Sequence, residues 1–128
     1  MKEFIKVLTA EAMTMVNNTN TAVSVKSGSL PVFATPMMTA LMEEATCYAA
    51  AELLDEGETT VGTAINISHD KASGIGKTIT AYAALNEVDG RTLYFDVYAK
   101  DDEGDIIGKG TIERFVVIKD KFMKRVNK

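Results

Sequence analysis

The chain is poor in the residues that build disulfide scaffolds, zinc sites and rigid loops. Its 128 residues include one cysteine, one histidine, two prolines and no tryptophan. The single cysteine, Cys47, cannot form an internal disulfide, so the composition does not support an oxidising compartment. The single histidine, His69, cannot assemble the multi-residue ligand set that zinc requires. Neither dinucleotide nor nucleoside-triphosphate motifs are present, and we expect no metal and no cofactor.

Long apolar runs and an excess of basic residues are also missing. No apolar run approaches the roughly 20 residues that a membrane span needs, and Met1 to Leu8 lacks the features of a signal peptide. The net charge of −4, from 14 basic and 18 acidic residues, argues against a nucleic-acid surface. We therefore expect a cytoplasmic protein that binds neither membrane nor nucleic acid. The length suits a single domain over residues 1–128.

One segment, Val32 to Leu54, has the composition of a helix. Thr35 can cap a helix and Pro36 fits the first helical position, and the residues after Pro36 are mainly Met, Ala, Leu and Glu, which are good helix formers. Gly57 is a plausible stop signal. The segment is apolar on nearly every face, which predicts a helix enclosed by its own sheet or by a partner subunit as well. In that setting we expect Cys47 to be a small core residue.

The remainder of the chain has the patterning of strands. The first 25 residues look extended, and Ala22 to Val25 alternates apolar and polar residues. Four strand-like segments come after the helix: Thr60 to His69, Lys77 to Leu85, Thr92 to Ala99 and Asp105 to Ile118. Asp89-Gly90 is a strong hairpin signal between two of them. In the segment after this turn Leu93, Phe95, Val97 and Ala99 alternate with Tyr94, Asp96 and Tyr98, which predicts an antiparallel meander with one buried face. The order predicts an α+β fold in which an antiparallel sheet wraps one long helix, and open sheet edges favour a homodimer.

Thr35, near the start of the helix, and His69, at the end of the first strand after it, are candidates for chemistry. His69 has the same parity as Thr63, Ile65 and Ile67, so all four should point to one face. A hydrogen-bonded histidine at a strand end would explain it equally well. Thr35 has the alternatives of a structural N-cap and of a hydroxyl beside a helix N-terminus, where negative charge is stabilised.

Glu43 and Glu44 lie in the middle of the apolar helix. They differ by about 100° around the axis, so they cannot share one environment. Buried carboxylates need hydrogen bonds or a raised pKa, and such groups cluster at functional sites. The alternative is that one reaches solvent while the other pairs with a lysine or arginine. Thr35 and Glu43 are separated by roughly 12 Å of helical rise, which argues against direct contact within one subunit. His69 placed between them, or a site shared across a dimer interface, would join them.

The spacing of these residues resembles a known family. The stretch from Val32 through Thr35-Pro36 to Glu43 is similar to the start of the central helix in the fluoroacetyl-CoA thioesterase family of hotdog proteins. Val61–His69 looks like the matching strand of that family, and Ile107–Arg114 looks like its last strand. The resemblance covers residues 32–126 and implies a hotdog fold.

The resemblance also implies a set of functional residues. The family's catalytic threonine, glutamate and histidine fall on Thr35, Glu43 and His69, which selects Glu43 over Glu44. Residues expected to contact the acyl-CoA substrate are Gly62, Arg114, Phe33 and Met37.

The implied reaction is hydrolysis of a short or medium acyl-CoA thioester, with His69 as general base or acid. Two alternatives on the same fold are a non-catalytic acyl-CoA or small-ligand binding protein and a hydratase or dehydratase. The fluoroacetyl-specific enzyme carries an aromatic lid segment before its helix, whereas Lys26–Ser29 here contains no aromatic residue.

Overall fold

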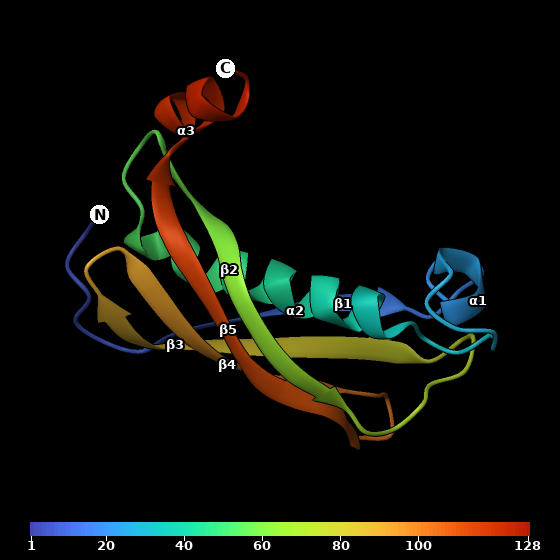
Figure 1. The fold of residues 1–128 in the computed structure, drawn as a ribbon. Helices are drawn as coiled ribbons and strands as arrows, with labels where there is room; N and C mark the ends of the chain where they lie inside the picture. Colours follow the sequence, from blue (N-terminus) through green and yellow to red (C-terminus); the bar gives the residue numbers. More distant parts are fainter.

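A five-stranded antiparallel sheet curves around one long helix in the computed structural model, which describes residues 1–128 (Figure 1). The strands stand in the order β1-β3-β4-β5-β2. Their bounds are β1 Leu8–Met15, β2 Glu58–His69, β3 Thr78–Asp89, β4 Thr92–Lys100 and β5 Ile106–Ile118. The helices are α1 Ala22–Val25, α2 Thr35–Ala50 and α3 Lys119–Val126, and one 3-10 turn, Ala51–Leu53, continues α2. The expected α+β arrangement, the four later strands and the hairpin at Asp89-Gly90 are confirmed.

The strand expected at Ala22 to Val25 is wrong, because these residues form the short helix α1. Local hydrogen bonds favour the turn. The Thr21 and Ser24 hydroxyls are 2.8 Å apart, and Lys26 adopts a left-handed conformation (φ 64°) that ends the helix. Four residues of alternation are too few to distinguish a strand from one helical turn.

The start and end of α2 also differ from the expectation. Ala34 occupies the N-cap position and Thr35 is the first helical residue, so Thr35 is not the cap. Its hydroxyl is therefore free to bond elsewhere. The helix ends at Ala50 and the 3-10 turn at Leu53, so Gly57 (φ 84°) belongs to the turn before β2 and does not end the helix.

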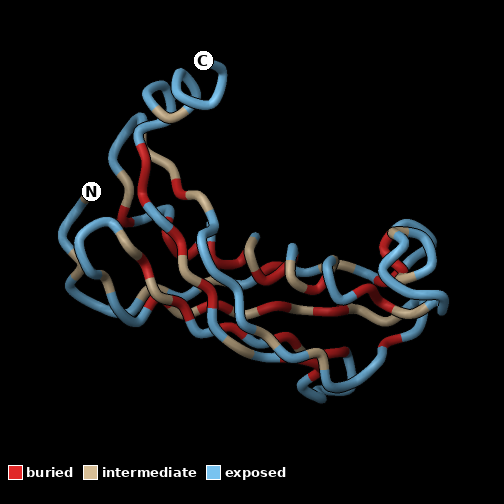
Figure 2. Tube along the Cα trace, viewed as in Figure 1, coloured by how far each residue is buried: buried red, intermediate tan, exposed pale blue.

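The core lies between α2 and the concave face of the sheet (Figure 2). Met38 and Met42 of α2 are fully buried there, as are Leu93 and Phe95 of β4, as the alternation in β4 predicted. The opposite flank of α2 is exposed, including Cys47. The expectation that Cys47 is a core residue is therefore wrong for the single chain. The sheet encloses one side of α2, and enclosure of the other side by a partner subunit stays a prediction. None of the helices is both long and apolar enough to cross a membrane.

An irregularity in β2 determines which side chains face α2. Gly62 pairs with Arg114 of β5 and Ala64 pairs with Glu113, so Thr63 is an extra residue, a β-bulge. In a regular strand, residues seven apart point to opposite faces. The bulge reverses the alternation, so Gly62 and His69 both face α2. The regular alternation expected from Thr63 to His69 is therefore present only after the bulge, because Thr63 is itself the extra residue.

Candidate functional site

The first part of the site joins the start of α2 to the end of β2. Thr35 Oγ1 lies 2.8 Å from His69 Nδ1, within hydrogen-bond distance. Thr35 reaches the ring because it is the first residue of α2 and its hydroxyl caps no backbone N–H. Two residues 34 positions apart in the chain are thus brought together. The N-terminus of α2 adds a partial positive charge beside this pair.

His69 has the electrostatic properties of a proton-transfer group. Burial lowers the pKa of its imidazole from the ordinary value of 6.5, because desolvation disfavours the charged form. The ring is therefore neutral at pH 7 and able to accept a proton. Its other nitrogen, Nε2, is buried and has no hydrogen-bond partner within the chain. A buried, unpaired nitrogen is costly, and such groups are common where a substrate completes the hydrogen bonding.

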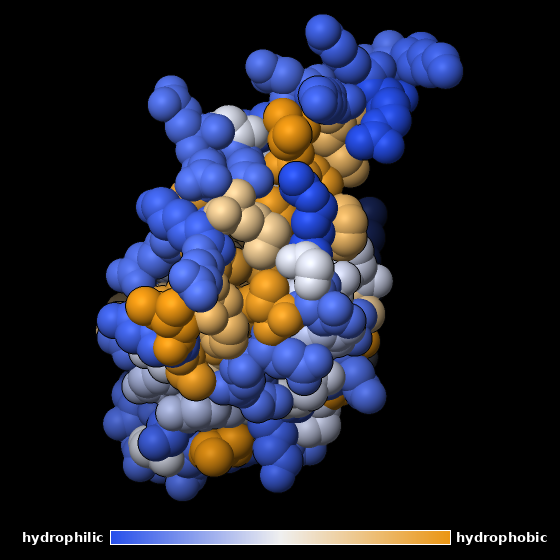
Figure 3. All heavy atoms as spheres, turned by 90° about the vertical axis from the view of Figure 1, so that its left-hand side faces the viewer, coloured by the Kyte–Doolittle hydropathy of each residue, from blue (hydrophilic) through white to orange (hydrophobic).

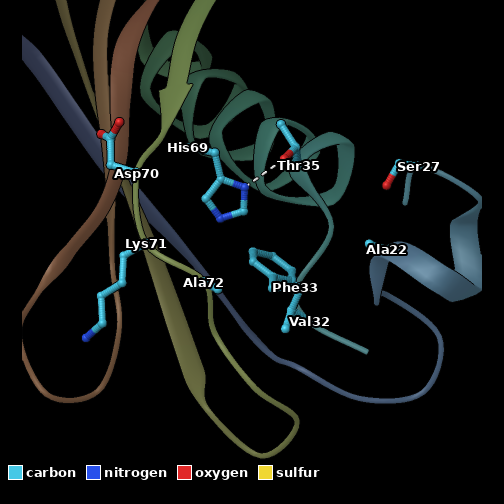
Figure 4. A pocket seen from close by; sticks show the side chains of 9 residues that line it. All are labelled: Ala22, Ser27, Val32, Phe33, Thr35, His69, Asp70, Lys71 and Ala72. Atoms are coloured by element: carbon cyan, nitrogen blue, oxygen red, sulfur yellow. Dashed lines mark hydrogen bonds between the residues drawn. The ribbon is translucent and has the colours of Figure 1, made fainter. Parts of the chain in front are cut away.

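A cavity of about 220 Å³ opens beside this pair. Figure 4 shows Thr35 and His69 facing it from α2 and β2, with Phe33 below them and α1 across the opening. Phe33 is buried and forms part of the apolar wall. The other lining residues are Ala22, Ser27, Val32, Asp70, Lys71 and Ala72. The cavity thus combines an apolar wall, a hydroxyl and an imidazole, as binding sites for small polar-headed ligands do.

The second part of the site lies two turns further along α2. Glu43 Oε2 accepts a hydrogen bond of 3.0 Å from Arg114 Nη1. Arg114 is buried, and its Nε donates to Thr60 Oγ1 at 2.8 Å while Nη2 donates to the Thr60 carbonyl at 3.2 Å. The guanidinium is therefore held by β2 and its position sets that of the carboxylate. A planar guanidinium with several donors suits this role better than a lysine would.

Gly62 lies directly against the Glu43 carboxylate. A Cβ atom at position 62 would be 2.7 Å from Glu43 Oε2 and 3.4 Å from Arg114 Nη1. Only glycine leaves room for the carboxylate in its observed position. Gly62, Arg114 and Glu43 thus form one cluster, which the resemblance had named as separate residues.

The two carboxylates of α2 have different surroundings, as expected. The side chain of Glu43 is 32% exposed and paired with arginine, whereas Glu44 is exposed and accepts a hydrogen bond of 2.6 Å from the Tyr48 hydroxyl. The alternative of one arginine-paired and one solvent-facing glutamate is therefore confirmed. Met37 is half-buried and lines a separate cavity of about 150 Å³ on the β1 side of α2, so within the chain it does not contact the Thr35–His69 cavity.

Two features of the site were not found from the sequence. Thr60 belongs to no motif, and only the pairing of β2 with β5 shows that it holds Arg114. The bulge at Thr63 has no turn residue of its own, although the neighbouring Gly62 is the signal that often accompanies a bulge. Within one chain the structure pairs Thr35 with His69 and Glu43 with Arg114, but it does not bring Glu43 to the imidazole.

Comparisons with known proteins cover both clusters. The family model of the fluoroacetyl-CoA-specific thioesterases matches residues 16–120. A fluoroacetyl-CoA thioesterase from Streptantibioticus cattleyicolor is 45% identical over 95 residues, which are 74% of this chain and 68% of that protein. A crystal structure of a fluoroacetyl-CoA-specific thioesterase variant with fluoroacetate and CoA has a TM-score of 0.84 at 36% identity and covers 91% of this chain and 95% of that one. A thioesterase superfamily member from Thermus thermophilus has a TM-score of 0.91 at 26% identity, covering 99% and 93% of the two chains.

Proposed function

The chain belongs to the family of fluoroacetyl-CoA-specific thioesterases, and from this premise we propose that it hydrolyses the thioester bond of a short acyl-CoA. The observation that carries the proposal is the hydrogen bond between Thr35 and His69 at the edge of the cavity. It orients a neutral imidazole whose second nitrogen is buried and unpaired. A related enzyme has been solved with CoA and fluoroacetate, a ligand pair of the same chemistry.

In the proposed reaction, the acyl group lies in the cavity and its carbonyl carbon is attacked. His69 accepts a proton from the attacking water and returns it to the leaving sulfur, so that the C–S bond breaks and a carboxylic acid and free CoA form. Thr35 holds the ring in the required orientation. Glu43, held by Arg114, presents its carboxylate to the acyl carbon or to the water. No metal ion or organic cofactor is needed for this series of steps.

A homodimer built on β2 supports a complete site. β2 is an edge strand of 12 residues, and residues 62–66 are exposed on both faces. It carries no charged residue or proline between Glu58 and His69, so it lacks the usual protection of an edge strand. We propose that two copies pair their β2 strands antiparallel and form one continuous sheet. The exposed flank of α2, with Cys47 and Tyr48, then faces the partner helix.

This pairing also solves the separation of Glu43 from His69. Gly62 marks the position of Glu43 on β2, and His69 lies seven residues further along the strand. Antiparallel pairing about residues 65 and 66 places Gly62 of one chain opposite His69 of the other. We therefore propose that Glu43 of one protomer acts with Thr35 and His69 of its partner, so that each dimer contains two shared sites.

The acyl group is proposed to be short and different from fluoroacetyl. Phe33 is the one aromatic residue that lines the cavity, and the α1 side of the lining consists of the small side chains of Ala22 and Ser27. The segment 22–29, to which Ala22 and Ser27 belong, contains no aromatic residue. We also place the protein in the cytoplasm, because Cys47 is free and exposed and suits a reducing compartment. Cell fractionation would test this location.

The test of hydrolysis is thiol release from a panel of acyl-CoAs, from acetyl and fluoroacetyl to octanoyl, read with a thiol reagent. Wild type should release CoA, and His69→Ala and Glu43→Gln should lose at least about 100-fold in kcat. Glu87→Gln is the matched control and should retain wild-type turnover, because Glu87 is exposed on β3, away from α2 and β2. Thiol release from none of the substrates, with CoA binding retained in a thermal-shift assay, would refute hydrolysis and favour a binding protein.

The test of the dimer is a charge placed on the exposed part of β2. Ile65→Arg puts like charges near each other across the proposed pair and should give a monomer that has lost activity. Ile75→Arg is the control, because Ile75 is also exposed but lies in the loop after β2. Light scattering after size exclusion gives the mass. A fully active Ile65→Arg monomer would refute the shared site.

A further inference from the structure

The C-terminal helix α3 stands away from the rest of the chain and has two chemically distinct faces. It comes directly after β5 and buries no residue, and Figure 1 shows it projecting beyond the end of the sheet. Phe122, Met123 and Val126 share one face at helical spacing. Lys121, Lys124 and Arg125 occupy the opposite face, and all three are exposed. Figure 3, which views this end of the molecule, shows mainly hydrophilic atoms at the position of α3.

The charge of the chain is divided unevenly around this helix. Residues 119–128 contain five basic residues and one acidic residue, whereas residues 1–118 contain nine basic and 17 acidic residues. The last ten residues therefore carry a net charge of +4 in a chain whose other 118 residues carry −8. A concentrated positive patch attracts a ligand with several negative charges, while the acidic remainder of the protein repels that ligand from other parts of the surface.

The strand order determines where α3 lies in the proposed dimer. The last residue of β5, Ile118, pairs with Glu58 at the start of β2, so α3 and the cavity beside His69 are at opposite ends of β2. Antiparallel pairing of two β2 strands brings the start of each beside the end of the other. In the proposed register Glu58 is opposite residue 73 of the partner, four residues beyond His69. The α3 of one protomer then lies two strand spacings, about 10 Å, to the side of the partner's β2 and about 13 Å further along the strand direction than the partner's His69.

We propose that the basic face of α3 binds the phosphate groups of the CoA whose acyl group occupies the cavity of the partner subunit. The inference rests on the proposed function and on its dimer. The acyl end of the substrate is neutral and lies against Phe33 and the Thr35–His69 pair, while the nucleotide end carries all the negative charge. Residues 119–128 hold the densest group of basic residues in the chain, and Asp120 is the single acidic residue among them. The nearest lysine to the cavity, Lys71, is already paired with Asp101 and Asp105.

The first test measures the dissociation constant of CoA itself by calorimetry, which does not require turnover. Lys121→Glu/Lys124→Glu should weaken CoA binding about tenfold, and the effect should shrink as salt is added. Lys100→Glu/Lys109→Glu changes the charge equally and is the control. Both of its residues lie on the outer face of the sheet, away from α2, and it should bind CoA like wild type. An unchanged dissociation constant in the α3 variant would overturn the proposal.

The second test compares KM for an acyl-CoA with KM for the acyl-pantetheine thioester, which has no phosphate. The α3 variant should raise KM for the first about tenfold, leave KM for the second unchanged, and leave both kcat values unchanged. An equal rise for both thioesters would show a structural defect and overturn the assignment to phosphates.

The third test determines which protomer supplies the helix. A heterodimer, isolated with two affinity tags, combines His69→Ala and normal α3 in one protomer with normal His69 and the α3 double variant in the other. The only active imidazole then receives a normal α3 from its partner, so KM should return to the wild-type value. A raised KM would overturn action across the dimer. If wild type hydrolyses no acyl-CoA but binds CoA through α3, the proposed function fails and the phosphate site stands; if it binds no CoA, both fail.

Discussion

Gly62→Ala is the sharpest single test of the carboxylate half of the site. The new Cβ would lie 2.7 Å from Glu43 Oε2, whereas an ordinary contact begins at 3.4 Å. The carboxylate must therefore move by about 0.7 Å, which lengthens or breaks its 3.0 Å hydrogen bond to Arg114. Misplacement of a reacting group by about 1 Å can reduce the rate roughly 100-fold. We expect kcat on the best acyl-CoA to fall between about 10-fold and 100-fold.

The same substitution should leave the fold nearly unchanged in stability. The backbone at Gly62 is not in the left-handed region, so alanine is not strained there, and the far end of a flexible side chain can move aside. Alanine also reduces the entropy of the unfolded chain, which contributes about 0.4–1 kcal/mol of stability. Urea unfolding should therefore show a change of less than about 1 kcal/mol.

The matched control is Gly74→Ala, where no atom lies within 4 Å of the added Cβ and φ is not positive. It should retain wild-type kcat and stability. Wild-type kcat in Gly62→Ala would refute the reasoning, because it would show that the position of Glu43 does not limit the reaction. A loss of several kcal/mol in stability would refute it too, because the loss of activity would then come from unfolding.

Two further predictions concern His69 and Arg114. His69 is the only histidine, so its imidazole C–H signal can be followed in an NMR titration. The midpoint should lie below 6.5 in the folded protein and near 6.5 in denaturant. The value of kcat/KM should fall tenfold per pH unit below the folded midpoint, since the protonated ring accepts no proton. Stability should also fall as pH drops from 6.5 through that midpoint, because the unfolded chain binds the proton first, and a folded midpoint above 6.5 would contradict both expectations. Arg114→Leu should cost about 2 kcal/mol in urea unfolding, less than the loss of a fully buried pair because Glu43 is about a third exposed. An unchanged unfolding midpoint would show that Arg114 does not hold Glu43 and Thr60 in place.

The sequence predicted strands and turns correctly where the alternation of apolar and polar residues was long. The β4 alternation of Leu93 and Phe95 and the Asp89-Gly90 turn predicted the meander correctly, because the period of side chains in a strand depends only on backbone geometry. Sequence signals that were short, or that fitted two different roles, did not predict the structure correctly. Ala22 to Val25 was too short to distinguish from a helical turn, and Thr35 fitted a cap so well that its bond to His69 could not be foreseen from local chemistry.

The sequence by itself determined which residue types were available: one histidine, two adjacent carboxylates in an apolar helix, and a threonine before a proline. The family resemblance singled out Glu43, Gly62 and Arg114 from that supply. Only the tertiary structure decided which of these residues meet. Strand pairing placed Arg114 across from Gly62, and the β-bulge at Thr63 turned Gly62 and His69 to the same face. These relations join residues up to 71 positions apart, and they depend on the register between strands, which local sequence patterns do not specify.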